Sequence, residues 1–411
     1  MTDSNNSNKT ICAGIKYHHS MNISFSSSEI HTQEEYYGVI EENLRRNGCS
    51  YIDISNAKPG ENAIADDFRI TSDFLHGGGI PFAQRRYLLT DIKPELIKFP
   101  LSCVAVILTV FQEHNIAQIC YCFEGEFDTD NLIYLRHIIG DAQAFVSAND
   151  KTEQKSLKSF TSEIAEKAGV SFSDVEMQYL CEFRRFFDYD SVADIIENEP
   201  KRVYGILCGD EGWQFVSQEV VRARLSNSWS SRNFMRYVTF GNNAGLFNLI
   251  GSTEYEAYLK REDEFGNKIY GGVNDYFTLK SHIAGLNHGI IYAEESILLI
   301  KTAINRILHR NSAFKHNSKK RLGAQISETR SYRNELIRTL NEVENLEISE
   351  LGELEQLLIG CYRVSPLIED AKYLLEMLDS ELGLLYQQRT NQLVNFLTIA
   401  GLLLTVIGLL L

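Results

Sequence analysis

The chain has 411 residues, a net charge of −15 at pH 7 and ordinary fractions of apolar and charged residues. This length is sufficient for two or three domains with a sizeable core. The acidic balance argues against direct nucleic-acid binding as the main task, because such a surface repels the phosphate backbone. The first residues, MTDSNNSNKT, contain no apolar signal-peptide segment, so we expect the bulk of the chain to be cytoplasmic.

Residues 1–20 are polar at their start and are predicted to form a disordered tail. Residues 21–276 are predicted to form an α/β or α+β cytoplasmic domain, in which strands alternate with helices. Short apolar, β-rich runs predict strands at 103–111, 117–123 and 202–208. Helical patterns occupy residues 33–46, 131–141 and 156–167.

Residues 277–391 are predicted to form antiparallel helices and a stalk, because apolar residues there recur at helical spacing. In the stalk they recur every three or four positions: Leu367, Ala371, Leu374, Leu378, Leu382 and Leu385. No proline or glycine pair separates this pattern from Leu393. We therefore predict one continuous helix of about 40 residues, with coiled-coil character, that enters a membrane.

The final segment, residues 392–411, is predicted to be a transmembrane helix. From Leu393 to Leu411 there are nineteen residues and no charge. At about 1.5 Å per residue this is a rod of roughly 28 Å, which matches the core of a bilayer. We expect a single-pass protein of the inner or plasma membrane, in contact with lipid.

The polar residues of this segment lie on one side of the helix. On a wheel of about 100° per residue they fall within an arc of about 80°: Asn391, Asn395, Thr398 and Thr405, with Leu402 and Leu409 on the same arc. Gly401 and Gly408 lie on its flank, where small residues allow close helix packing. Since polar groups avoid lipid, the arc predicts a ring of such helices with this stripe inward. A simple tail anchor remains the alternative.

The stalk and its entry into the membrane resemble those of CorA-type divalent-cation transporters. The resemblance rests on Gln-x-Arg-x-Asn-x-x-x-Asn-x-Leu-Thr-Ile, which begins at Gln387 and ends at Ile399. It implies a homopentamer with Asn391, Asn395, Thr398, Leu402 and Thr405 facing a pore, and Mg²⁺ or another divalent cation as the ion. The family's second membrane helix and Gly-Met-Asn motif have no counterpart in this sequence. Relatives without that motif are membrane effectors of prokaryotic antiviral defence, which implies a nucleotide messenger as activator.

Two further groups of residues are candidate sites. Arg222, Arg224, Arg232 and Arg236 lie near Trp229, and arginines beside an aromatic ring can bind a phosphate or stack on a base. Glu124, Glu126, Asp128 and Asp130 alternate after an apolar run. If the chain stays extended, these four point to one side and offer oxygen ligands to a hard cation. The alternative for the arginines is a helix surface paired with nearby acids, and for the carboxylates it is a solvated loop.

These observations favour a CorA-like, homo-oligomeric cation channel or ligand-gated membrane effector. The alternative is a tail-anchored sensor or scaffold with a ligand-binding cytoplasmic domain and no transport. An enzyme is not expected, because the sequence has no nucleophile–base pair, metal-ligand spacing or phosphate loop.

Overall fold

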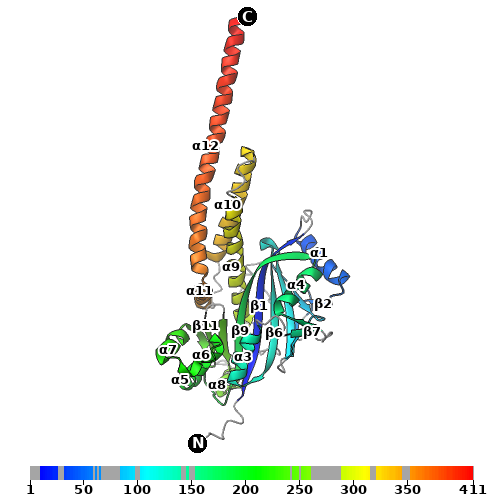
Figure 1. Ribbon diagram of the computed structural model, residues 1–411, viewed down its shortest axis with the longest axis vertical. Coiled ribbons are helices and arrows are strands. Elements are labelled where there is room, and N and C mark those ends of the chain that lie inside the picture. The colour runs from blue at the N-terminus through cyan, green and yellow to red at the C-terminus, as the bar shows by residue number, and fades with distance from the viewer. Residues whose placement is uncertain are drawn as a thin grey trace, which may run out of the picture. The chain divides into compact units, whose positions relative to one another are not determined.

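The computed structural model describes residues 10–25, 32–58, 61–62, 64–65, 84–97, 102–139, 145–147, 153–240, 243–249, 251–260, 288–314, 321–344 and 352–410 (Figure 1). They fall into two compact units. The first contains the described residues up to Thr302 and helix α11 (Gly352–Cys361); the second contains the remainder of α9 (His288–Phe314), α10 (Leu322–Glu344) and α12 (Val364–Leu410). The predicted fold class, an α+β domain followed by long helices and a C-terminal apolar helix, is confirmed.

The first unit is built on a large sheet. In spatial order its described strands are β10 (Ser228–Arg232), β11 (Met235–Phe240), β12 (Asn243–Asn248), β9 (Val170–Phe186), β1 (Ile11–Phe25), β6 (Ile116–Phe127), β5 (Ser102–Phe111), β3 (Arg85–Leu89) and β2 (Tyr51–Asp53). Neighbouring strands are antiparallel except β12 and β9, which are parallel. A small second sheet contains β4 (Pro94–Leu96), β7 (Phe145–Ser147) and β8 (Gln154–Lys155).

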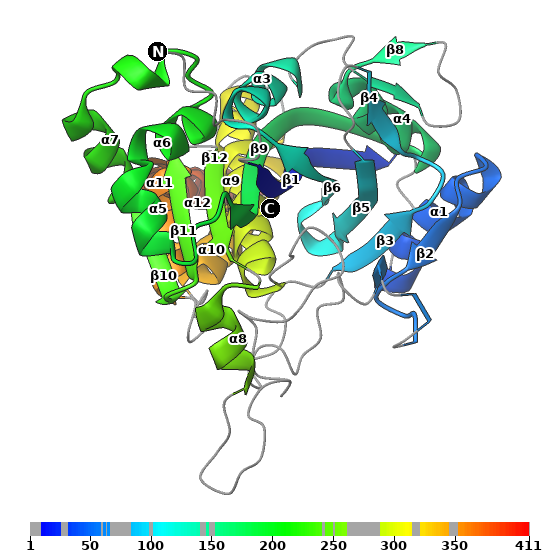
Figure 2. The same ribbon diagram turned by 90° about the horizontal axis from the view of Figure 1, so that it is seen from below.

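Helices cover both faces of the large sheet (Figure 2). On one face, Thr161 of α4 (Leu157–Lys167) is hydrogen-bonded to His19 of β1. On the other face, Thr302 of α9 is hydrogen-bonded to Ser20 of β1. The face toward α4 also carries α3 (Thr129–Ile139) and α6 (Pro200–Cys208). The remaining helices of the unit are α1 (Gln33–Arg46), α5 (Val192–Asn198), α7 (Gln218–Leu225) and α8 (Thr253–Lys260), with short 3-10 turns at Gln112–His114 and Trp213–Phe215.

The predicted disordered tail is wrong for residues 11–20, because β1 begins at Ile11 and lies in the middle of the sheet. Its side chains alternate between the two faces, as in any strand. Ile11, Ala13 and Ile15 supply the apolar half of this alternation, and all are buried. Lys16, His18 and Ser20 resemble surface residues in the sequence, but they are buried as well, opposite α9. Residues 1–9 lie outside the described part of the chain.

The strand predicted at residues 202–208 is wrong, since this segment is helix α6. Pro200 occupies its first turn, and Gly209 follows its end with a left-handed backbone of φ 64°. These are the usual start and stop residues of a helix. Val203, Ile206 and Leu207 are buried at helical spacing, so the apolar run forms one helix face rather than a strand.

The second unit consists of long helices that pack through leucines and isoleucine. Ile326 of α10 packs with Leu382 and Leu385 of α12. Arg306 and Arg310 of α9 donate to the two carboxylate oxygens of Glu335, with N–O distances of 2.8 and 3.1 Å. Helix α12 runs without interruption for 47 residues, as the continuous stalk and membrane helix predicted from the sequence. Pro366 lies in its first turn, where a missing N–H breaks no helical hydrogen bond.

A buried network of charged and polar side chains joins α9 to the sheet within the first unit. Tyr237 donates to Glu294 at 2.7 Å, and Asn248 donates to Glu182 at 3.0 Å. Lys16 Nζ lies 3.7 Å from Glu182, and His18 Nε2 lies 3.8 Å from Glu294. Arg86 pairs with Glu295. All of these side chains are buried.

The network contains three carboxyls but only two lysine or arginine side chains, beside the imidazole of His18. Glu182, Glu294 and Glu295 face the cations Lys16 and Arg86. Burial raises the pKa of Glu182 and of Glu294 to about 7, although Lys16 opposes this shift for both. An unpaired buried charge is unfavourable, so the network takes up a proton near neutral pH.

Replacing Glu294 by Gln is expected to stabilise the protein at alkaline pH. The pKa of Glu294 is near 7 in the folded protein and about 4.5 in the unfolded chain. The unfolded chain therefore releases this proton first, and the free energy of unfolding falls as pH rises from about 4.5 to 7. Glu294→Gln removes this loss and should gain about 1–3 kcal/mol at pH 8, with little change at pH 4.5. Denaturant unfolding of the full chain in neutral detergent at both pH values measures the difference.

Lys16→Met is the matched substitution, and it is expected to change stability in the opposite direction. It leaves the neighbouring buried carboxylates without their cation and should lower stability by about 3–5 kcal/mol at pH 8. A Glu294→Gln variant that is less stable than the parent at pH 8 would show that the network holds no surplus charge.

Candidate functional site

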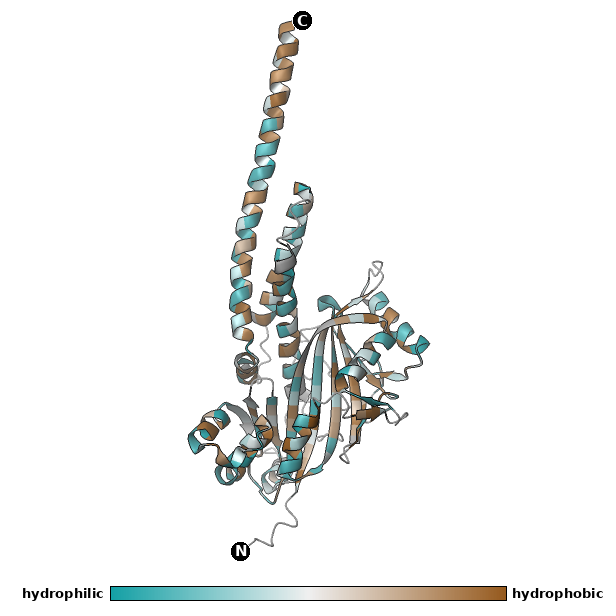
Figure 3. Ribbon diagram, in the orientation of Figure 1, coloured by the Kyte–Doolittle hydropathy of each residue, from teal (hydrophilic) through white to brown (hydrophobic). Residues whose placement is uncertain are grey.

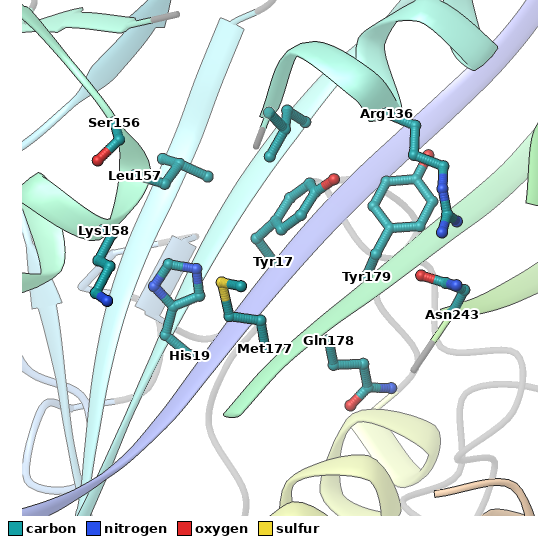
Figure 4. A pocket seen from close by; sticks show the side chains of 11 residues that line it. Tyr17, His19, Arg136, Ser156, Leu157, Lys158, Met177, Gln178, Tyr179 and Asn243 are labelled. Carbon is teal, nitrogen blue, oxygen red and sulfur yellow. The ribbon is translucent and has the colours of Figure 1, made fainter. Parts of the chain in front are cut away.

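A pocket of about 510 Å³ lies on the face of the sheet that α3 and α4 cover (Figure 4). Its size is within the range of small-molecule sites. Strands β1, β9 and β12 supply one part of the lining, and the helices supply the rest: Tyr17, His19, Met177, Gln178, Tyr179 and Asn243, with Arg136, Ile139, Ser156, Leu157 and Lys158.

Two tyrosines on adjacent strands form the aromatic part of this lining. Tyr17 of β1 and Tyr179 of β9 are directly opposite in the strand register, and their ring centroids are 5.1 Å apart. They share a face because opposite residues of paired strands point the same way. Met177, two residues before Tyr179, lies beside them in the pocket (Figure 4) and is 53% exposed.

Arg136 is placed at one end of the pocket by α3. Its guanidinium donates to the backbone carbonyl of Leu207 and lies 5.4 Å from the centroid of the Tyr179 ring. Gly209 permits this position, since a Cβ at that residue would come within 2.7 Å of the arginine side chain. Arg136 forms no ion pair with any residue in the described part of the chain.

The N-terminus of α4 forms the other end of the pocket. The hydroxyl of Ser156 accepts a hydrogen bond from the backbone N–H of Ser159 at 3.0 Å and so caps the helix. Lys158 follows two residues later and is exposed. In Figure 4, Lys158 and Arg136 lie on opposite sides of Tyr17.

His19 adds a neutral wall between these ends. Its Nδ1 lies 2.7 Å from the hydroxyl of Thr161, which also meets the Tyr121 hydroxyl at 2.9 Å. Burial, with smaller contributions from the nearby His18 and Lys158, lowers the pKa of His19 to about 4. His19 is therefore uncharged at neutral pH. The described lining residues include two cations and no carboxylate, so the pocket is positively charged.

The predicted arginine stretch is divided between separate places. Arg222 and Arg236 line one pocket of about 520 Å³, together with Glu197. Arg224 lines another, of about 820 Å³, with Arg363. Trp229 is buried and packs in the core. Arg232 ends β10, and its side chain lies outside the described part.

The four predicted metal-binding carboxylates do not continue along one extended strand. Strand β6 ends at Phe127, and α3 begins at Thr129. Glu124 pairs with Arg184 at 2.8 Å, and Glu126 pairs with Arg185 at 2.9 Å. The prediction that all four share one side is therefore wrong, because the chain leaves the strand after Phe127 and enters helix α3.

Asp128 has a structural role at this turn. Its carboxylate accepts hydrogen bonds from the backbone N–H and the side-chain amide of Asn131, at 2.7 and 2.9 Å. Asp130 lies in the first helical turn and is exposed. No three of the four carboxylates bring ligand atoms within 4.8 Å of one another in the described structure.

Among the described residues, α12 is the one helix that is long and apolar enough to cross a membrane, and its apolar part is the C-terminal half. Its large apolar side chains are exposed, and in Figure 3 the ribbon near the C-terminus has mostly the hydrophobic colour. Thr398 and Thr405 each donate to the carbonyl four residues earlier, at 2.9 Å. The helix fits a single-pass membrane protein and is compatible with membrane association.

The pocket was missed from the sequence because β1 was expected to be disordered. The alternation Ile15, Tyr17, His19 and Met21 is the signal that could have identified this strand and its aromatic face.

Comparisons of the chain with protein families, with curated proteins and with solved structures found no match.

Asp128→Ala is expected to lower the stability of the protein by about 1 kcal/mol, because it removes the N-cap of α3. Asp130→Ala, the matched control, should lower it by only a few tenths of a kcal/mol. Thermal unfolding with and without Mg²⁺ also tests the cation site. A Mg²⁺-dependent rise in melting temperature that both variants abolish would support metal binding at these carboxylates instead.

Proposed function

We propose that this protein is a homo-oligomeric membrane effector of CorA-like type, in which copies of α12 surround a cation path. The observation that carries the proposal is the distribution of apolar residues on α12. In its stalk part this helix has a buried apolar face and a second, exposed face with large apolar side chains among uncharged polar ones.

The buried face of α12 packs inside its own unit. Ala371, Leu374, Leu378, Leu382 and Leu385 are buried, and α10 is the helix against which α12 packs. With about 100° per residue and Asn391 at zero, these five residues lie between about 100° and 180°.

The exposed face lies on the opposite side and is named here the α12 seam. It lies within about 40° of Asn391 on the same wheel: Tyr373, Met377, Ser380, Leu384 and Gln387. Tyr373 is 65% exposed and Leu384 is 62% exposed. Between Tyr373 and Gln387 no residue of the seam is charged, and the exposed Glu369, at the same angle as Gln387, marks its lower end. Spacings of three and four residues are those of a coiled-coil interface.

The α12 seam continues without a change of phase into the polar stripe of the membrane segment. Asn391, Thr398 and Leu402 lie within about 20° of its centre line. A membrane holds every copy in one orientation and at one depth, so equivalent positions of neighbouring copies meet. This favours a second copy of α12 as the partner of the seam, and a parallel bundle as the assembly.

Within such a bundle the inward residues suit a cation path. The hydroxyl protons of Thr398 and Thr405 are used within the helix, so their oxygens retain lone pairs that can accept from water or face a cation. Asn391 and Asn395 add amide groups. Leu402 and Leu409 are the hydrophobic constrictions that could close the path. The resemblance to CorA proteins favours Mg²⁺ or another divalent cation and a pentamer.

The first unit would then serve as the sensor. Its positively charged pocket supports recognition of a small anionic molecule, and the resemblance to defence effectors favours a nucleotide messenger. The alternative function, a tail-anchored sensor without transport, retains this pocket and reduces α12 to an anchor. It predicts that an unrelated apolar helix can replace residues 393–411 without loss of function.

Leu384→Glu is expected to break the assembly, because it places repelling charges at the centre of the α12 seam. Tyr386→Glu is the matched control, since Tyr386 is 43% exposed but lies off the seam, at about −140°. The mass of the assembly is measured for the full chain in mild detergent. The parent and Tyr386→Glu should have the mass of an oligomer, and Leu384→Glu should have a smaller mass. A monomer or dimer in all three proteins would favour the anchor.

Leu402→Ser and Asn395→Leu are expected to change cation flux in opposite directions in reconstituted liposomes. The first widens and wets a hydrophobic constriction, and the second removes a polar group from the path. Unchanged flux in both variants, in protein that is still oligomeric, would contradict the cation path while leaving the assembly intact.

A further inference from the structure

The pocket between α3 and α4 carries charge that the fold does not use. Lys158 is exposed and has no ion pair within the described residues, and Arg136 donates to a backbone carbonyl and lies over an aromatic ring without an ion pair in the same part of the chain. By contrast, Arg184 and Arg185 of the same unit each pair with a carboxylate. A half-buried guanidinium without an anion is unfavourable unless a ligand supplies one.

The two cations are separated by an apolar floor. Tyr17 lies between them in Figure 4, with Met177 beside it and Leu157 near the Lys158 end. Aromatic rings and a thioether favour a flat, apolar partner. His19 is neutral and bonded to Thr161, so it adds no charge to this middle part.

Each end of the pocket offers donors as well as charge. At one end Lys158 lies in the first turn of α4, whose N-terminus favours negative groups. At the other end Arg136 presents a planar guanidinium that suits carboxylate or phosphate oxygens, with Asn243 in the lining beside it.

We propose that this pocket binds an elongated small molecule with a flat apolar body and an acidic group at each end. One acidic group lies at Lys158 and the α4 N-terminus, and the other lies at Arg136. The inference concerns the first unit only, so it stands whether or not α12 forms a cation path.

The test uses three naphthalene probes with the full chain in a neutral detergent. Naphthalene-2,6-dicarboxylate has two acidic groups, 2-naphthoate has one, and 2-naphthalenemethanol has none. Isothermal titration should give affinities in that order, with about tenfold or more between steps, because each charge-assisted contact contributes that much. Titration into micelles alone corrects for partition of the rings into detergent.

Substitutions locate the binding. Arg136→Gln and Lys158→Gln should each reduce affinity for the diacid about tenfold or more, to the level of 2-naphthoate, and leave 2-naphthalenemethanol unchanged. Met177→Trp should block all three probes, because the larger side chain fills the pocket from an exposed position. Arg222→Gln is the matched control, since Arg222 lines a different pocket, and it should bind like the parent.

Four results would overturn the proposal, and three of them concern the parent and the two charge variants. The neutral probe could bind as tightly as the diacid, the diacid could bind the Arg136→Gln and Lys158→Gln variants as tightly as the parent, or none of the probes could bind. Met177→Trp protects the test against misfolding of Arg136→Gln, whose arginine also bonds Leu207. The fourth result is an unchanged affinity in Met177→Trp, which would show that the probes bind elsewhere.

Discussion

Burial of charged side chains between α9 and the sheet is the constraint on which the first unit depends. Glu294 and Glu295 are adjacent on a helix and both are buried, so their positions are acceptable only where the sheet offers partners. Lys16, Arg86 and Tyr237 come from separate strands and meet these demands together. Such a network allows one register of α9 on the sheet, since a shifted helix would leave carboxylates buried and unpaired.

Strand β1 connects this constraint to the pocket. Lys16 and His18 point toward α9, whereas Tyr17 and His19 point toward α4. A slip by one residue would exchange the two sets and would place charges among the tyrosines. The charged face therefore fixes the register that brings Tyr17 opposite Tyr179, and the pocket follows from it.

Helix α12 satisfies two environments in succession. Along its stalk it packs with one apolar face against α10 and leaves the seam of Tyr373, Met377 and Leu384 exposed. Farther along, every apolar side chain faces outward, as suits lipid. A helix with an unpartnered seam in phase with the polar stripe of its membrane segment is well suited to self-association, which is why the proposed assembly and the proposed path share one surface.

Local and periodic features of this protein were determined by the sequence alone. The apolar C-terminal segment, the stalk spacing and helices such as Gln33–Arg46 depend on neighbouring residues, and the structure agrees with them. Features that depend on contacts between residues far apart in the chain were not determined by the sequence alone. The polar half of β1 resembles a tail until α9 covers it, and residues 202–208 resemble a strand until Pro200 and Gly209 are seen to bound a helix. Arg136 and Lys158 are 22 positions apart, and only the packing of α3 and α4 on one sheet face brings them to the two ends of one pocket. Pairing across a sheet depends on residues far apart in the chain, which periodicity cannot reveal.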